Sequence, residues 1–215
     1  MKTIEQAKKN PMYLYLIVLT ISSTMGLQAW RTLFNNFAVE VAGLNGQYVG
    51  MIQSVREIPG FLALLTVFVI IFIKEYRVSA LSILILGLGV AATGLFPSYA
   101  GLLLTTLVMS FGFHYYETTN MSLTLQYFDE KTSPWVFGKQ RSYAAVANIA
   151  VGALIFILSP TLNYASLYGL LGCVIIILAL WGFSKDPSDR HLVPQHNEMI
   201  FRRRYWLFYF LTFMA

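Results

Sequence analysis

Long apolar segments separated by short polar gaps make up most of this 215-residue chain. Six of these segments approach or exceed the ~20 residues that a helix needs to cross the hydrocarbon core of a bilayer. Backbone groups inside lipid must hydrogen-bond within their own segment, and the runs are too long for the strands of a membrane barrel. The pattern therefore predicts an all-α polytopic membrane protein with six transmembrane helices, at 12–37, 47–73, 78–95, 100–127, 142–158 and 161–183.

The basic residues lie in alternate gaps. Every Lys and Arg except Arg31 and Arg56 stands before the first segment or after the second, fourth or sixth. Short loops rich in Lys and Arg stay on the cytoplasmic side of a membrane. We therefore expect a multi-pass protein of the plasma membrane, the inner membrane in a bacterium, with residues 1–11 in the cytoplasm.

The region after the sixth segment changes character twice. Residues 184–204 are polar and contain two prolines, which predicts a cytoplasmic linker. Residues 205–215 are apolar again and correspond to about 16 Å of helix, roughly half of a bilayer. We expect them to be the start of a truncated seventh helix, and the chain to be a fragment or the product of a truncated reading frame.

Composition excludes several classes of function. The chain is 57% hydrophobic and 12% charged, whereas a soluble domain carries about 25% charged residues. The net charge of +5 follows from the loop pattern, so it does not predict nucleic-acid binding. No nucleophile elbow, phosphate loop or set of metal ligands stands out. We expect no enzyme activity, no cofactor and no metal.

Polar residues recur at helical spacing in the first, second, fourth and fifth segments, which predicts helix faces turned toward protein or water. The third and sixth segments lack charged residues and carboxamides in their interiors, and we expect them at the periphery. The candidates for substrate binding or ion coupling are Gln28, Arg31, Asn35, Gln53, Arg56, Glu57, His114, Glu117 and Asn148.

Depth along the helices separates these candidates. Arg31 lies near the outer end of its segment and Glu117 in the inner half of another, so we do not expect them to pair directly. Arg31 is better placed for Glu57 or Glu40, and Glu117 for Arg141. Glu57 and His114 lie nearest the middle. A buried carboxylate there either carries protons or braces the helices as a salt bridge.

The six helices, charged linker and start of a seventh helix resemble the N-terminal half of a major facilitator superfamily transporter. The loop 74–77 stands where that family carries Gly-x-x-x-Asp-Arg-x-Gly-Arg-Arg, although it is shorter and lacks the glycines. Glu75 stands in for the aspartate and Arg77 for a loop arginine. The loop 138–143 is similar to the family's approach to its fifth helix.

The resemblance implies a bundle of two inverted three-helix repeats over 12–183, and a second six-helix half as its partner. It also implies a cytoplasmic gate at Glu75, Arg77 and Arg141. We expect a secondary active transporter that moves a small molecule by alternating access, coupled to protons or another ion as a symporter or antiporter.

Three alternatives stay open at this point. A non-transport scaffold or sensor could use the same six helices. The chain could be an inactive fragment of an interrupted transporter gene. An intramembrane enzyme could use His114 and Glu117, which are spaced i, i+3 on one helix.

Overall fold

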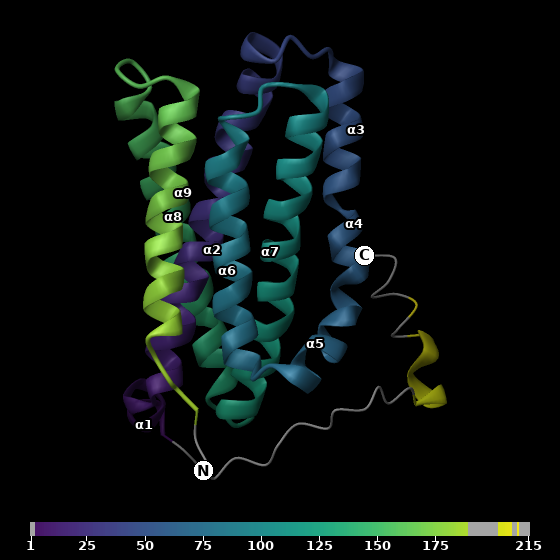
Figure 1. Cartoon of the computed structure of the whole chain (residues 1–215). Helices are drawn as coiled ribbons and strands as arrows, with labels where there is room; N and C mark the ends of the chain where they lie inside the picture. The colour runs from purple at the N-terminus through teal and green to yellow at the C-terminus, as the bar shows by residue number, and fades with distance from the viewer. Residues whose placement is uncertain (1–2, 189–201, 208–209, 211–215) are drawn as a thin grey trace.

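A computed structural model describes residues 3–188, 202–207 and 210, and helices are its regular secondary structure throughout those residues. The long helices run side by side as a bundle (Figure 1). A further crossing beside α7 is built from three shorter helices, and a short helix precedes α2. The helices are α1 (Ile4–Lys9), α2 (Pro11–Asn36), α3 (Gly46–Arg56), α4 (Ile58–Phe61), α5 (Thr66–Phe72), α6 (Glu75–Thr93), α7 (Tyr99–Tyr127), α8 (Ser133–Leu158) and α9 (Tyr164–Phe183).

The helices fit a multi-pass membrane protein. Among the described residues, five stretches are long and apolar enough to cross a membrane, namely Pro11–Val41, Gly46–Phe72, Glu75–Thr93, Ser133–Leu158 and Tyr164–Phe183. Helix α7 fills the fourth predicted segment and is 29 residues long, so its length suffices. Its polar middle, residues 114–120, makes it less apolar than the other five.

The predicted linker at 184–204 and the predicted seventh helix at 205–215 lie mostly outside the described residues. Within them the structure describes one 3₁₀ turn, Arg203–Tyr205.

Short polar side chains fix where four of the long helices begin. Each accepts a hydrogen bond from a backbone N–H of the first turn, which satisfies a donor that has no partner within the helix. The capping residues are Asn10 for α2, Asn45 for α3, Ser98 for α7 and Asn163 for α9.

The predicted start of the fifth segment, at 142, is wrong. Helix α8 begins at Ser133, with a proline in its first turn, and it includes Lys139 and Arg141. Proline is well tolerated at the first helical positions, where its missing N–H is not needed. The charged residues that predicted a loop are instead carried on the exposed side of a helix that continues beyond its apolar part.

The second predicted segment is helical but interrupted. Helix α3 ends at Arg56, and the Glu57 N–H bonds to the Ser54 carbonyl at 3.2 Å, a tightened i→i−3 contact. Pro59 cannot donate a backbone hydrogen bond, which disfavours a regular helix here. A 3₁₀ turn, Leu62–Leu65, then separates α4 from α5. The crossing is thus broken from Glu57 onward, two residues before Pro59.

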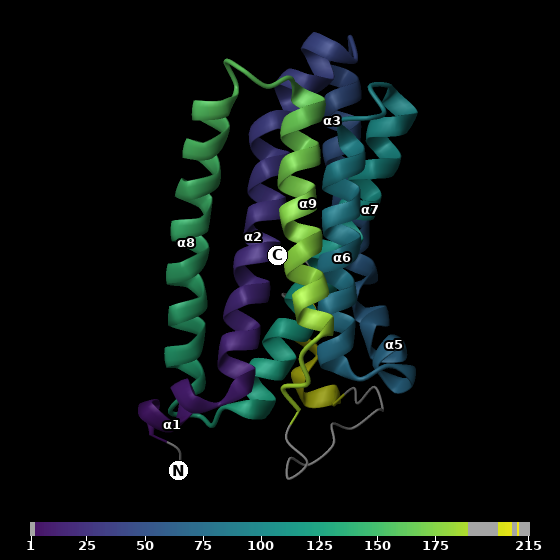
Figure 2. The same ribbon diagram turned by 60° about the vertical axis from the view of Figure 1, so that its left-hand side comes forward.

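Helix α6 packs closely against both α7 and α9. A Cβ on Gly112 of α7 would lie 2.4 Å from the Leu86 backbone nitrogen of α6, and a Cβ on Gly172 of α9 would lie 2.5 Å from the Ala91 Cβ. Backbones that approach this closely are typical of small residues at helix interfaces in membranes. Helix α8 and the α3–α5 crossing stand at opposite sides of the bundle (Figure 2).

Candidate functional site

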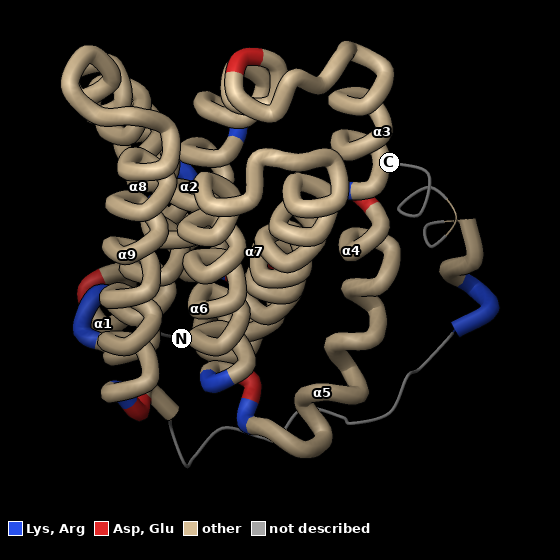
Figure 3. The backbone as a smooth tube through the Cα atoms, turned by 45° about the horizontal axis from the view of Figure 1, so that its top comes forward, with Lys and Arg blue, Asp and Glu red and all other residues tan. Residues whose placement is uncertain are grey.

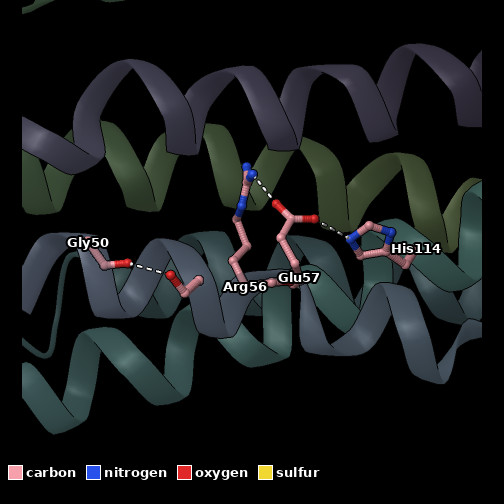
Figure 4. A network of polar contacts seen from close by, with 6 residues as sticks. Gly50, Arg56, Glu57 and His114 are labelled. Atoms are coloured by element: carbon pink, nitrogen blue, oxygen red, sulfur yellow. Dashed lines mark hydrogen bonds and ion pairs between the residues drawn. The ribbon is translucent and has the colours of Figure 1, made fainter. Parts of the chain in front are cut away.

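The break between α3 and α4 carries a charged cluster. The Arg56 guanidinium donates to the Glu57 carboxylate, and the other oxygen of Glu57 faces His114 Nε2 of α7 at 3.8 Å (Figure 4). Glu57 lies about 17 Å along its crossing from the start of α3, at 1.5 Å per residue. His114 is close to the midpoint of α7. The cluster therefore lies well inside the length of the bundle.

A small cavity of about 50 Å³ adjoins this cluster. Side chains from three crossings line this cavity. Arg31 comes from α2, Arg56 and Glu57 come from the break, and Ser110 and His114 come from α7. The structure thus places four of the predicted site residues, Arg31, Arg56, Glu57 and His114, around one space. Arg31 and Glu57 line the same cavity, and Glu57 is one of the two carboxylates, with Glu40, that the depth of Arg31 favoured.

Neighbouring groups hold Arg56 in place. Its backbone carbonyl accepts a hydrogen bond from the Ser110 hydroxyl of α7. Its guanidinium carbon lies 5.5 Å from the centre of the Trp30 ring, within the range of a cation–π contact. Trp30 is itself fully buried and stacks on Phe34 at 4.2 Å. These contacts link the break to both α2 and α7.

His114 packs against the same break. A Cβ at Gly60 would lie 3.1 Å from His114 Cε1, so the absence of a side chain there lets the imidazole approach α4. Tyr115 donates a hydrogen bond to the Leu62 carbonyl at 3.2 Å, at the 3₁₀ turn that follows α4. Helix α7 thus contacts the interrupted crossing at two irregular points.

Glu117 belongs to a different part of the bundle. It lies on the exposed side of α7, and Arg141 of α8 is the opposite charge that acts on its carboxylate. No ion pair joins Glu117 to Arg31 within the part of the chain that the structure describes. The depths estimated from the sequence likewise favoured Arg141, and not Arg31, as the partner of Glu117.

The predicted carboxamides lie outside the cavity wall. Gln28 is half-buried and donates to the Thr32 hydroxyl on its own helix at 3.1 Å. Gln53 is half-buried on α3, and Asn35 and Asn148 are exposed on α2 and α8. The structure therefore brings four of the five predicted ionisable residues together, all except Glu117, and leaves the predicted amides apart.

Two of the predicted gate residues lie on the first turn of α6. The Glu75 carboxylate accepts a hydrogen bond from Ser122 near the end of α7. The Arg77 guanidinium carbon lies 5.6 Å from the Tyr76 ring. Arg141, the third gate residue, lies on α8, and no ion pair links it to either of the others among the described residues.

Two buried polar contacts were missed by sequence reasoning. Asn120 of α7 and Gln140 of α8 exchange reciprocal side-chain hydrogen bonds of 3.2 and 3.1 Å. The fully buried Tyr116 hydroxyl bonds to Thr20 of α2 at 2.8 Å. Gln140 falls in the predicted loop 138–143, so it was not predicted as a partner for Asn120.

A comparison with protein-family models and a comparison with curated proteins both find no match to this chain. Within the described residues, no group of three or more His, Cys, Asp and Glu side chains is arranged to hold a metal ion.

Proposed function

We propose that this chain is one six-helix half of a secondary active transporter of the major facilitator type, which moves a small solute by alternating access. In this proposal α7 is the fourth of six membrane crossings, in addition to the five stretches that are apolar enough by themselves, and a second six-helix half packs against this bundle. The observation that carries the proposal is Glu57, a carboxylate at a break in an apolar helix, held between Arg56 and His114. Ionisable residues inside membrane helices are costly and mark ion or substrate pathways.

The packing of the helices supports an inverted repeat. Exchanging α2 with α7, the α3–α5 crossing with α8, and α6 with α9 maps the most extensive packing pairs onto each other, whereas the contact of α2 with α6 has no counterpart of similar extent between α7 and α9. The contact of α2 with α8 becomes that of α7 with α3 and α4, and the contact of α6 with α7 becomes that of α9 with α2. All of these pairs are in contact. Inverted three-helix repeats of this kind build transporter halves.

The charges support a cytoplasmic N-terminus. Between residues 3 and 188, every Lys and Arg other than Arg31 and Arg56 lies at or near the end of the bundle that carries α1 (Figure 3). Basic residues gather on the cytoplasmic side of membrane proteins. In this orientation Glu75, Arg77 and Arg141 would stand at the cytoplasmic mouth.

Glu57 is the proposed coupling residue. Its two neighbours come from different elements, because Arg56 lies at the break itself and His114 lies on α7. Protonation of Glu57 would release Arg56 and alter the contact between the break and α7. This change would link proton binding to a rearrangement of the interrupted crossing.

Proton-linked uptake in proteoliposomes tests the proposal. The chain is reconstituted with its second half, and solute-driven pH changes are recorded for panels of sugars, amino acids and carboxylates. We expect at least one solute to move protons with the wild type, and Glu57→Gln to abolish proton movement while solute exchange continues. Glu130→Gln, which removes an exposed carboxylate between α7 and α8, is the matched control.

Two results would contradict this function. The first is that no solute in any panel crosses the membrane, as a scaffold, sensor or inactive fragment requires. The second is that Glu57→Gln and Glu130→Gln retain the same ratio of protons to solute as the wild type, which would remove Glu57 from coupling.

A further inference from the structure

The cavity beside the break contains more positive charge than the protein neutralises. Arg31 and Arg56 both line it, and Glu57 is its only carboxylate. Both oxygens of Glu57 are already engaged, one by Arg56 and the other by the facing His114. One guanidinium therefore has no counter-charge at this site. A charged residue in a membrane helix normally pairs with a partner or marks a binding pathway.

Arg31 is the guanidinium without a partner. No hydrogen bond, ion pair or other electrostatic interaction joins it to another residue in the described part of the chain. Its side chain is exposed at the wall of the cavity, so it is accessible to a ligand. Glu40, the other carboxylate near this end of α2, accepts a hydrogen bond of 2.7 Å from Tyr164 instead.

Two buried donors at the same place also lack acceptors. Arg56 Nε and Trp30 Nε1 are both inaccessible to solvent, and neither has a hydrogen-bond partner. Leaving a buried donor unsatisfied is costly, so such atoms in a native site call for a ligand or an ordered water. Arg56 lines the cavity, whereas Trp30, whose ring centre lies 5.5 Å from the Arg56 guanidinium carbon, stands next to Arg56 outside the cavity lining.

The cavity has room for such a group. A single water needs roughly 10–15 Å³ of space of this kind, so about 50 Å³ admits a group larger than one water. Carboxylates match the planar guanidinium of arginine, because two parallel hydrogen bonds form between them. Excess positive charge, unsatisfied donors and limited volume all favour a small anionic group over a cation or a neutral solute.

We propose that this cavity binds the carboxylate of a small organic anion between Arg31 and Arg56, and that anion binding and protonation of Glu57 reinforce each other. The proposal rests on the proposed transport function, for which it names the substrate class. The carboxylate of Glu57 and that of the ligand compete for Arg56. A proton on Glu57 removes this competition, so the anion and the proton are taken up together, as in a symporter.

The ionisable groups that surround Glu57 are all basic, so each of them favours anion binding when it carries a positive charge. Arg56 adjoins it in the chain, His114 faces it from α7, and Arg31 shares its cavity from α2. Protonation of His114 would add a further positive charge beside the ligand. Acidification therefore strengthens anion binding through either group, and replacing Glu57 isolates its share.

Isothermal titration of the purified 215-residue chain, in nanodiscs of phosphatidylcholine, tests this site without requiring transport. The probes are acetate and benzoate, with glucose and tetramethylammonium as neutral and cationic references. We expect benzoate and acetate to bind the wild type more tightly than either reference. We also expect binding to tighten as the pH is lowered.

Four variants locate the binding. Arg31→Gln removes an exposed charge and should weaken carboxylate binding by about tenfold or more, since it deletes a charge-assisted hydrogen bond. Arg31→Lys should restore part of the affinity. Glu57→Gln should bind as tightly at high pH as the wild type does at low pH. Lys131→Gln, which removes an exposed charge between α7 and α8, should bind like the wild type.

Three results would overturn the anion site. Carboxylates could bind no more tightly than glucose, or Arg31→Gln could bind them as well as Lys131→Gln does. Loss of benzoate binding on adding phosphatidylglycerol would assign the site to a lipid headgroup instead of a solute. If carboxylates bind as expected but no solute crosses proteoliposomes, the transport proposal fails while this site stands.

Discussion

Helix α6 and the α3–α5 crossing both have the length and hydropathy of membrane helices, but they pack in opposite ways. In their most apolar stretches, 61% of α6 residues are buried inside the bundle, against 11% in the α3–α5 crossing. Helix α6 is regular from Glu75 to Thr93 and packs between α7 and α9, whereas the crossing is divided into three helices and packs mainly against α7. The charged cluster lies on the loosely packed crossing. The comparison teaches that hydropathy predicts which segments enter the membrane. Small residues at the helix interfaces then decide which of these segments pack closely against one another.

A substitution that forces α6 and α7 apart tests the tightly packed region most directly. A Cβ at Gly112 would overlap the Leu86 nitrogen and lie 2.5 Å from the Ser82 carbonyl oxygen, and backbone atoms cannot rotate away. Gly112→Ala should therefore lower the free energy of unfolding by about 3 kcal/mol or more. Reversible unfolding in mixed detergent micelles, followed by circular dichroism, measures this change.

Gly152→Ala is the matched control on α8, because a Cβ there meets nothing within 4 Å. It should change the free energy of unfolding by less than about 1 kcal/mol, and in the stabilising direction, since alanine is the better helix former. Equal losses in the two variants would refute the division into a tight and a loose region.

A second change tests how α8 is attached. Gln140→Leu leaves the nearly buried Asn120 amide without its partner, which should cost about 1–3 kcal/mol of unfolding free energy. Adding Asn120→Leu removes the stranded group and should recover part of the loss. A double-mutant cycle in the same micelles measures the coupling, and strictly additive losses would show that the two amides do not stabilise one another.

The smallest expected effect concerns the contact between α2 and α7. Tyr116→Phe removes the hydroxyl that bonds to Thr20, which should lower the free energy of unfolding by about 1 kcal/mol. Tyr143→Phe, at an exposed position on α8, should leave it unchanged. If the thermal unfolding midpoints of the two variants coincide, the buried hydroxyl contributes nothing to the packed region.

The existence of the long helices could be predicted from the sequence, because hydropathy and length determine which segments are stable in lipid. Their ends could be predicted only where a local signal exists. Asn45 and Asn163 begin helices as capping residues do, but Ser133 begins α8 without a side-chain cap and ahead of three polar residues. Those polar residues are compatible with either a loop or an exposed helical turn, and only packing against α7 decides between them.

The site was predictable in part for a similar reason. Charged residues in apolar segments are conspicuous, and depth alone favoured Glu57 or Glu40 over Glu117 as the neighbour of Arg31. The contacts of Trp30 with Arg56 and of Gly60 with His114 depend on how the crossings are rotated about their axes. A single sequence carries no signal for that rotation, since an aromatic residue or a glycine in a membrane helix fits many environments.

The break at Glu57 has a mechanical consequence. It leaves α3 as a separate helix about 16 Å long, joined to the remainder of its crossing where the regular helical hydrogen bonding is interrupted. A rotation of about 10° at that joint would displace the far end of α3 by about 3 Å, through leverage alone. The tightly packed α6 and α9 would not have to move. A change in charge at the pivot could therefore widen or narrow one end of the bundle, while the helices that anchor it stay in place.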